Sequence, residues 1–79
     1  MDVETPDRTL TQKPERVTRK RVEAGLRQGE LADLVGITRG HMNRIERGHV
    51  AASPSVLVRL ALALGCPAAD LMPPEEVAA

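Results

Sequence analysis

The residues best suited to binding chemistry lie close together between positions 37 and 48, in the stretch ITRGHMNRIERG. Three arginines, Arg39, Arg44 and Arg47, occur there together with Asn43. An arginine guanidinium can donate two parallel hydrogen bonds to a phosphate or to the edge of a guanine, and an asparagine amide can pair with adenine in a similar way. This stretch therefore has the chemistry needed to bind phosphate groups and base edges.

Two apolar residues in the same stretch indicate how a helix would position these side chains. Met42 and Ile45 lie three residues apart, so they share one face of an α-helix and should point into a core. Thr38 is a good N-cap, and Gly48 ends the pattern. The predicted outward face comprises Arg39, Gly40, Asn43, Arg44 and Arg47. Gly40 permits close approach to the backbone, at about 1 kcal/mol of helix propensity. An ordinary solvated face is the alternative interpretation.

Apolar residues at helical spacing, with no alternating strand pattern, predict an all-α fold. Five short helices are expected, at 14–24, 28–35, 39–47, 54–64 and 67–72. Pro14 and Pro54 suit first helical turns, whose N–H groups lack partners in any case. We expect residues 1–13 to be a flexible arm, residues 14–73 to form one compact five-helix domain, and residues 74–79 to be a tail.

The core must be built from aliphatic residues and methionine, because the chain has no Phe, Tyr or Trp. The apolar residues at helical spacing are Val17, Val22, Leu31, Ala32, Leu34, Val35, Met42, Ile45, Val56, Leu57, Leu60, Ala61 and Leu64. Such residues favour tightly packed helices over a large ligand pocket. No cofactor is therefore expected.

Cysteine and histidine usage argues against several kinds of site. The single cysteine, Cys66, cannot form a disulfide within the chain, and we expect it to be a buried structural thiol. His41 and His49 have no neighbours at metal-ligand spacing, so no metal site is expected. No nucleophile stands beside a base, and no glycine-rich loop could cradle a phosphate. An enzyme is therefore not expected.

The chain shows no pattern typical of export or membrane insertion. The N-terminus lacks a basic start followed by an apolar stretch, and no run approaches the roughly 18 apolar residues of a membrane span. A soluble, cytoplasmic protein is expected.

The formal net charge of zero hides an uneven distribution of charge. Residues 16–69 hold nine bases and four acids, a net charge of +5, whereas residues 70–79 hold three acids and no base. A basic face acts locally, because salt screens charges beyond roughly 10 Å. The middle of the chain is thus suited to an anionic polymer, although charge alone also fits an ordinary solvated surface.

Two short helices joined by a tight glycine-containing turn, over residues 28–47, match a helix-turn-helix, whose second helix enters the major groove of DNA. The chain resembles the lambda-repressor-like, or XRE, helix-turn-helix family across residues 16–72. The shared features occur in register: Arg21 before Gly25-Leu26, Gln28 before Glu30-Leu31-Ala32, Gly36-Ile37-Thr38, Glu46-Arg47-Gly48, Pro54-Ser55, and Ala61 to Gly65. The resemblance implies a five-helix domain that binds operator DNA as a two-fold dimer.

The resemblance also implies roles for single residues. Gln28 would bond a phosphate and brace the recognition helix, residues 39–47, because its amide both donates and accepts. The positions at which the family reads bases or adjacent phosphates are Arg39, Gly40, His41, Asn43 and Arg44. Arg21 and Glu46 match a structural pair that joins the first and third helices in family members.

The remaining basic residues divide into two groups. Arg27 stands where the family commonly has a Ser or Thr cap, and like Arg16 it lies near enough to the motif to contact a phosphate. His41 either contacts DNA or lies beside the contact surface, and His49 is expected in a loop. Ordinary surface charges are expected at Arg19, Lys20 and Arg59.

These patterns predict a sequence-specific, double-stranded DNA-binding transcription regulator, a repressor of phage or bacterial type that inserts helix 39–47 into an operator. The predicted DNA-binding set is Arg27, Gln28, Thr38, Arg39, Gly40, His41, Asn43, Arg44 and Arg47. A homodimer on DNA fits this interpretation. The alternative is an antitoxin or a protein-interaction adaptor on the same scaffold, whose acidic tails would bind a toxin or co-regulator.

Overall fold

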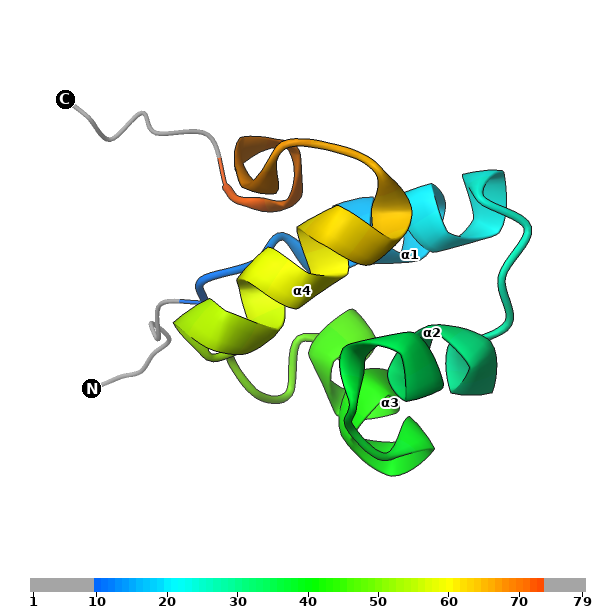
Figure 1. Cartoon of the computed structure of the whole chain (residues 1–79). Coiled ribbons are helices and arrows are strands. Elements are labelled where there is room, and N and C mark those ends of the chain that lie inside the picture. The colour runs from blue at the N-terminus through cyan, green and yellow to red at the C-terminus, as the bar shows by residue number, and fades with distance from the viewer. Residues whose placement is uncertain (1–9, 74–79) are drawn as a thin grey trace, which may run out of the picture.

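The computed structural model describes residues 10–73, which form four α-helices and a short 3-10 helix (Figure 1). The elements are α1 (Pro14–Glu23), α2 (Gln28–Val35), α3 (Arg39–Arg47), α4 (Pro54–Leu64) and η2 (Ala68–Leu71). No β-strand occurs within this range, so the all-α class is confirmed. Residues 1–9 and 74–79, most of the expected arm and the whole expected tail, lie outside the described residues.

The helices surround a single core, to which every element contributes buried side chains. α4 packs against α2 and η2, while α1 packs against α3 and η2. α2 and α3 contact each other at the end of the molecule opposite η2 (Figure 1). The two helices of the predicted helix-turn-helix therefore stand together at one edge of the fold.

The helix starts follow the capping residues that the sequence predicts. The Thr38 Oγ1 accepts a hydrogen bond from the His41 N–H at 3.0 Å, and the Ser53 Oγ accepts one from the Val56 N–H at 3.2 Å. Each bond satisfies an N–H group that has no partner inside its helix. These local signals set the N-termini of α3 and α4.

The core is aliphatic, as predicted. Its fully buried large side chains include Val17, Leu31, Val35, Met42, Ile45, Leu60 and Leu71. Two of the apolar residues at helical spacing are instead mostly exposed, because Val22 and Leu34 each retain 62% of their accessible surface. On α2, Leu34 lies about 100° around the helix from Val35, outside the narrow stripe that reaches the core.

The expectation of a fifth α-helix is wrong. The last element, η2, is a 3-10 helix of only four residues, Ala68–Leu71. Pro67 precedes it and Pro73 follows shortly after, and four residues are too few to establish an α-helical ladder. Its contribution is packing, because Leu71 is completely buried.

Of the flexible arm expected over residues 1–13, the structure describes residues 10–13, and these pack against the domain. Residues 10–13, which we call the N-terminal strap, run between the α3–α4 loop and η2, and Gln12 in this strap is fully buried. Its amide bonds to backbone groups of the α3–α4 loop. A buried, hydrogen-bonded side chain holds the strap in place, and no apolar stripe is needed. The apolar pattern of the sequence therefore does not predict this contact.

No helix among residues 10–73 is both long enough and apolar enough to cross a membrane.

Candidate nucleic-acid interface

A sharp turn sets α3 against α2. α2 ends at Val35 and is capped by Gly36, which adopts φ 82°, a left-handed conformation that glycine adopts readily. The Ile37 N–H then donates to the Ala32 carbonyl at 3.0 Å. Because α3 begins at Arg39, only three residues separate the two helices. The structure thus contains the helix-turn-helix geometry that the spacing predicts.

α3 has one buried face and one exposed face. Met42 and Ile45 are completely buried, as predicted from their spacing. Of the residues expected to face outward, Arg39, Gly40, Arg44 and Arg47 are exposed and Asn43 is half-buried. His41, expected either to contact DNA or to lie beside the contact surface, is half-buried as well. The structure therefore gathers these groups on one helix, outside the core. Thr38 also lies on the surface, with its hydroxyl oxygen occupied as the helix cap.

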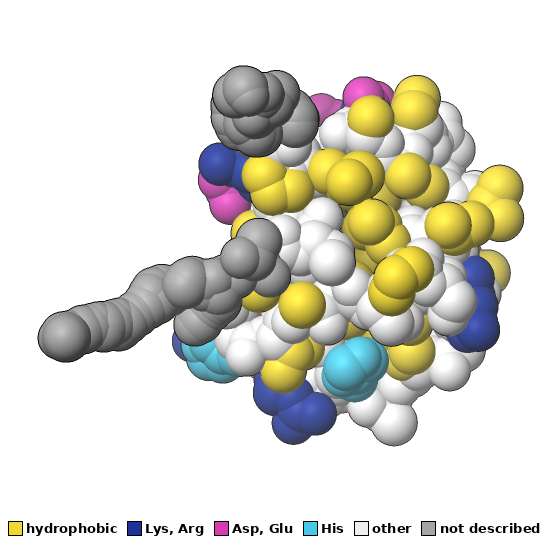
Figure 2. All heavy atoms as spheres, turned by 90° about the vertical axis from the view of Figure 1, so that its left-hand side faces the viewer, with side chains coloured by type: hydrophobic (Ala, Val, Ile, Leu, Met, Phe, Trp, Pro, Cys, Tyr) yellow, Lys and Arg dark blue, Asp and Glu magenta, His cyan; other side chains and the backbone are white. Residues whose placement is uncertain are grey.

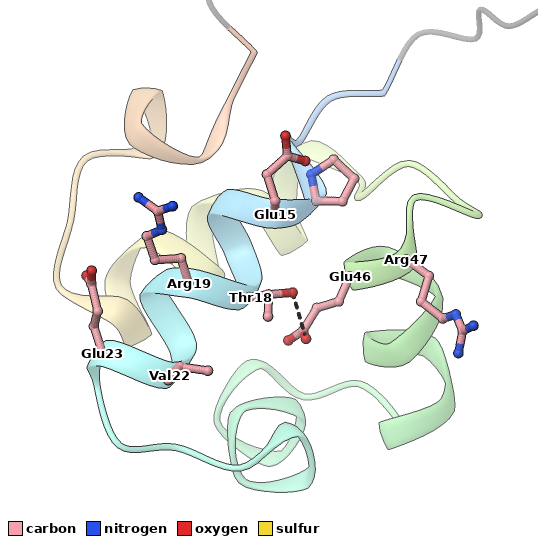
Figure 3. Close-up of a pocket in the computed structure, with 8 residues that line it drawn as sticks. Glu15, Thr18, Arg19, Val22, Glu23, Glu46 and Arg47 are labelled. Atoms are coloured by element: carbon pink, nitrogen blue, oxygen red, sulfur yellow. Dashed lines mark hydrogen bonds between the residues drawn. The ribbon is translucent and has the colours of Figure 1, made fainter.

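Glu46 joins α3 to both preceding helices. Its Oε2 accepts a bond from the Arg21 Nε at 2.7 Å, and its Oε1 accepts one from an Arg21 terminal nitrogen at 3.1 Å. The same Oε1 accepts from the Thr18 hydroxyl at 3.0 Å (Figure 3). It also accepts from the Gln28 Nε2 at 3.2 Å. Four donated hydrogen bonds therefore hold one carboxylate. We call this the Glu46 network.

Burial makes the Glu46 network a structural device. The Glu46 side chain is only 4% exposed and that of Arg21 16%, so both charges are largely removed from water. Arg21 also donates to the Leu26 carbonyl at 2.9 Å, which fixes the loop between α1 and α2. Removing one partner would leave the other charge buried without compensation, a strongly unfavourable state. The pair thus holds α3 against α1.

Gln28 connects this network to the outer face of α3. Its Oε1 lies 3.5 Å from the Asn43 Nδ2, a weak hydrogen bond, while its Nε2 bonds to Glu46. An amide nitrogen carries two hydrogens, so one Gln28 donor remains for an external acceptor. The bracing role and the phosphate role expected of Gln28 are therefore chemically compatible.

A hollow of about 540 Å³ opens beside the first turn of α2. It is lined by Arg27, Gln28, Gly29, Glu30, Asp33 and Arg39. The Glu30 carboxylate accepts a hydrogen bond from the Arg27 N–H at 2.7 Å, which closes the start of the helix in place of a Ser or Thr cap. Arg27 and Arg39 flank a helix N-terminus, a combination that favours an anion such as a phosphate.

The two glycines of this surface are not required for packing. A Cβ built on Gly40 meets nothing within 4 Å, and one on Gly29 meets only the Arg39 Cδ, at 3.9 Å. Neither residue adopts a left-handed conformation. Gly40 therefore leaves free space on the outer face of α3 that the fold itself does not use.

A second groove, of about 690 Å³, separates α1 from the end of α3 (Figure 3). Its lining residues are Pro14, Glu15, Thr18, Arg19, Val22, Glu23, Glu46 and Arg47. Glu46 lies within it, bonded to Thr18, and the guanidinium of Arg47 points away from α1 (Figure 3). With three carboxylates against two guanidiniums, this groove suits an anion less well than the hollow beside α2.

Cys66 fits a structural role. It is half-buried and packs against the core, and burial raises the pKa of its thiol, while the charge of Lys20 acts to lower that pKa and the charge of Asp70 to raise it. A raised pKa lowers the fraction of reactive thiolate at neutral pH. No cluster of potential metal ligands occurs in the part of the chain that the structure describes.

Three structural residues were not identified from the sequence. Arg59, expected as a surface charge, donates from Nη1 to the Val35 carbonyl at 2.9 Å and so caps the end of α2. Thr18 belongs to the Glu46 network, and Gln12 anchors the strap. Each contacts a group far away in the sequence, so no local pattern could reveal the partner.

Comparison with known proteins agrees with this geometry. A helix-turn-helix family model matches residues 17–71. No curated protein sequence gives a match. The restriction-modification controller protein C.AhdI from Aeromonas hydrophila is 32% identical with a TM-score of 0.72, covering 75% of this chain and 89% of that one. The P22 c2 repressor, solved with a synthetic operator, is 27% identical with a TM-score of 0.72 and the same coverages of 75% and 89%.

A third solved structure matches almost the whole chain. It is a hypothetical transcription factor from Neisseria, NHTF, 31% identical with a TM-score of 0.71, covering 99% of this chain and 93% of its own. The family match and these neighbours account for both helices of the motif and for the core behind them. The chain therefore belongs to the XRE, or lambda-repressor-like, helix-turn-helix family of DNA-binding transcription regulators, and not to a family of enzymes.

Proposed function

We propose that this protein is a sequence-specific repressor that inserts α3 into the major groove of a double-stranded operator. The observation that carries the proposal is the exposed row of Arg39, Arg44 and Arg47 on a helix whose opposite face is completely buried. An exposed guanidinium can read guanine, and each good contact of this kind discriminates by about 1–3 kcal/mol. The P22 c2 repressor, bound to its synthetic operator, offers a precedent within the same fold.

Phosphate contacts would set the register of α3 on the duplex. Arg27 is exposed at the start of α2, and Gln28 retains one free amide hydrogen beside it. Thr38 lies at the start of α3, where backbone N–H groups also point outward. We infer that these residues bind the sugar-phosphate backbone. Base contacts are assigned to Arg39, Asn43 and Arg44, with Gly40 allowing close approach and His41 and Arg47 bordering the groove.

The test is selection of bound sequences from a pool of random duplexes, followed by affinity measurements on the selected site. We expect one enriched motif, and a loss of affinity in Arg39→Ala and Arg44→Ala with stability changed by less than about 0.5 kcal/mol. Arg19→Ala is the matched control, because Arg19 is also an exposed helical arginine but lies on α1. No enrichment, or equal losses in all three variants, would contradict the proposal.

We further propose that two copies bind the operator together through α4. Val58 and Leu62 lie four residues apart on α4 and are 54% and 77% exposed. Hydrophobic side chains gather on one face of the molecule, with lysine or arginine side chains and histidine side chains toward its lower edge (Figure 2). A two-fold axis through such a face would bury it against itself and direct both copies of α3 to the same side of a duplex.

Sedimentation of the protein with and without its selected duplex tests the dimer. Leu62→Ser should weaken self-association and remove cooperative binding to half-sites about 10 bp apart. Leu34→Ser is the control, because Leu34 is 62% exposed but lies on α2. If Leu62→Ser leaves association unchanged, α4 is not the interface.

A further inference from the structure

Gln12 is the one fully buried polar side chain among residues 10–73. Its Nε2 donates to the Ile45 carbonyl at 3.1 Å and to the Val50 carbonyl at 2.9 Å, and its Oε1 accepts from the Ala52 N–H at 2.9 Å. Both amide hydrogens and the oxygen are therefore used. All three partners are backbone groups at the end of α3 or in the loop that follows it, and the Ile45 carbonyl also accepts a hydrogen bond from the Gly48 N–H at 3.2 Å.

The rest of the N-terminal strap holds the same loop. The Thr11 hydroxyl donates to the Ala52 carbonyl, and the Lys13 N–H donates to the Leu71 carbonyl at 2.6 Å. Leu10 also lies against the loop, since a Cβ built on Gly48 would stand 3.5 Å from the Leu10 Cδ1. The strap thus fastens the α3–α4 loop on one side and η2 on the other.

The loop continues directly from the exposed end of α3. Arg47 and His49 flank Gly48, and both side chains are exposed. The Ile45 carbonyl that accepts from Gln12 belongs to the last turn of α3 itself. The other end of α3 is fixed separately, because the Thr38 cap lies beside Arg39. A change in the strap should therefore move Arg47 and His49 and leave Arg39 in place.

We propose that Gln12 is a positioning residue for DNA binding, which holds Arg47 and His49 where they contact the phosphates of the operator. This inference rests on the proposed function. Gln12 itself should not contact DNA, because its amide is buried and its hydrogen bonds are all to groups within the protein. It acts by supplying partners for the Val50 carbonyl and the Ala52 N–H of an irregular loop, and by adding a second hydrogen bond to the Ile45 carbonyl of α3.

The first test compares Gln12→Met with a core variant of similar stability. Methionine keeps the length of the side chain but bonds to none of the three backbone groups, so the loop should loosen. Val35→Ala is the control, because Val35 is equally buried but belongs to α2. At a temperature at which both variants are folded, we expect affinity for the selected duplex to fall about tenfold in Gln12→Met and little in Val35→Ala.

The second test asks which end of α3 depends on Gln12. In double-mutant cycles, Gln12→Met should couple to Arg47→Ala, because a displaced Arg47 has less binding left to lose. It should not couple to Arg39→Ala. Backbone amide shifts of the free protein should change over residues 44–52 in Gln12→Met and remain near the wild-type values over residues 39–41. A role limited to overall stability would reduce affinity without either pattern.

The outcomes separate this inference from the proposed function. If the wild-type protein binds no duplex, the proposed function is wrong and the inference fails with it. If the wild type binds and Gln12→Met binds as tightly as Val35→Ala, the proposed function stands and only the role of Gln12 is overturned. Equal coupling to Arg39→Ala and Arg47→Ala would likewise overturn the local positioning role.

Discussion

Glu46 shows how one residue can belong to the helix that we propose to bind DNA and yet serve the core. It lies on α3, but its carboxylate is 4% exposed and accepts hydrogen bonds from Thr18 and Arg21 on α1 and Gln28 on α2. An ionised carboxylate is tolerated at this depth because nearly every lone-pair direction has a donor. The charge that might have opposed binding to DNA is thereby compensated inside the protein.

We predict that Glu46→Ala is the most destabilising single change on α3 among its polar residues. Arg21 would remain largely buried without its partner, and the loss of such a partner costs about 3–5 kcal/mol. Urea denaturation measures the effect. Arg47→Ala, one position further along the same helix and exposed, is the control and should change the free energy of unfolding by less than about 0.5 kcal/mol. Similar losses in the two variants would mean that the Glu46 network contributes little.

At the scale of the element, α3 is weakened as a helix in order to leave its outer face open. Its nine residues include Gly40, which lies in the first turn and has a low helix propensity. The helix compensates with the Thr38 cap, the buried Met42 and Ile45, and the ties made by Glu46. Tertiary contacts therefore outweigh local propensity in this segment.

Substitutions at Gly40 should separate folding from binding. A Cβ at position 40 meets nothing within 4 Å. Because alanine has a higher helix propensity than glycine, Gly40→Ala should raise the free energy of unfolding by about 1 kcal/mol. Gly40→Leu should also fold. The leucine side chain would fill the space between α3 and the floor of the major groove, so we expect Gly40→Leu to lose operator binding. Thermal unfolding and mobility shifts on the selected duplex measure the two effects. Wild-type binding by Gly40→Leu would place Gly40 outside the contact surface.

The sequence predicts elements well where the decisive contacts are local. The Thr38 hydroxyl accepts the N–H of His41, only three positions further on, and Met42 and Ile45 are buried as their helical spacing predicts. The sequence therefore predicts the position of α3 correctly. The strap was missed because the Ala52 N–H that bonds to Gln12 lies 40 positions away. The prediction of a fifth α-helix is wrong for a related reason. Leu71 is buried by contacts with distant residues, and a short 3-10 helix is enough to bring it there.

The candidate site follows the same division between local and distant contacts. Residue type and spacing are enough to predict which side chains of α3 point outward, because the helix period determines this. Pairing Arg21 with Glu46 required the family resemblance, since 25 positions separate them. Neither helical spacing nor the family resemblance predicts the hydrogen bond between Arg59 and the Val35 carbonyl, which are 24 positions apart.

For the whole molecule, charge is distributed so that zero net charge coexists with a basic binding domain. Residues 16–69 carry nine bases and four acids, and one of those acids, Glu46, is already paired internally. The remaining acids of this range do not lie on α3, whose exposed charges are all arginines. The long-range attraction to DNA should accordingly be moderate, with specificity concentrated near α3.

The salt dependence of DNA binding should depend on how many phosphates these basic side chains neutralise. If each subunit neutralises about four phosphates, the logarithm of affinity should fall with the logarithm of salt concentration at a slope near −3.6 per subunit. Arg27→Ala should reduce the magnitude of that slope by about 0.9, since one phosphate contact is lost. Arg19→Ala, on α1, should leave it unchanged. A slope near zero would mean that phosphates contribute little to binding.

The division of α3 into two faces has a consequence for how such a protein can change over generations. Met42, Ile45 and Glu46 hold the helix, whereas Arg39, Gly40 and Arg44 are exposed to solvent, and Gly40 adjoins empty space. If α3 reads the operator as proposed, a mutation on the outer face should alter which operator is recognised and leave the folded population almost intact. New target sites can therefore arise one substitution at a time, without a compensating change in the core.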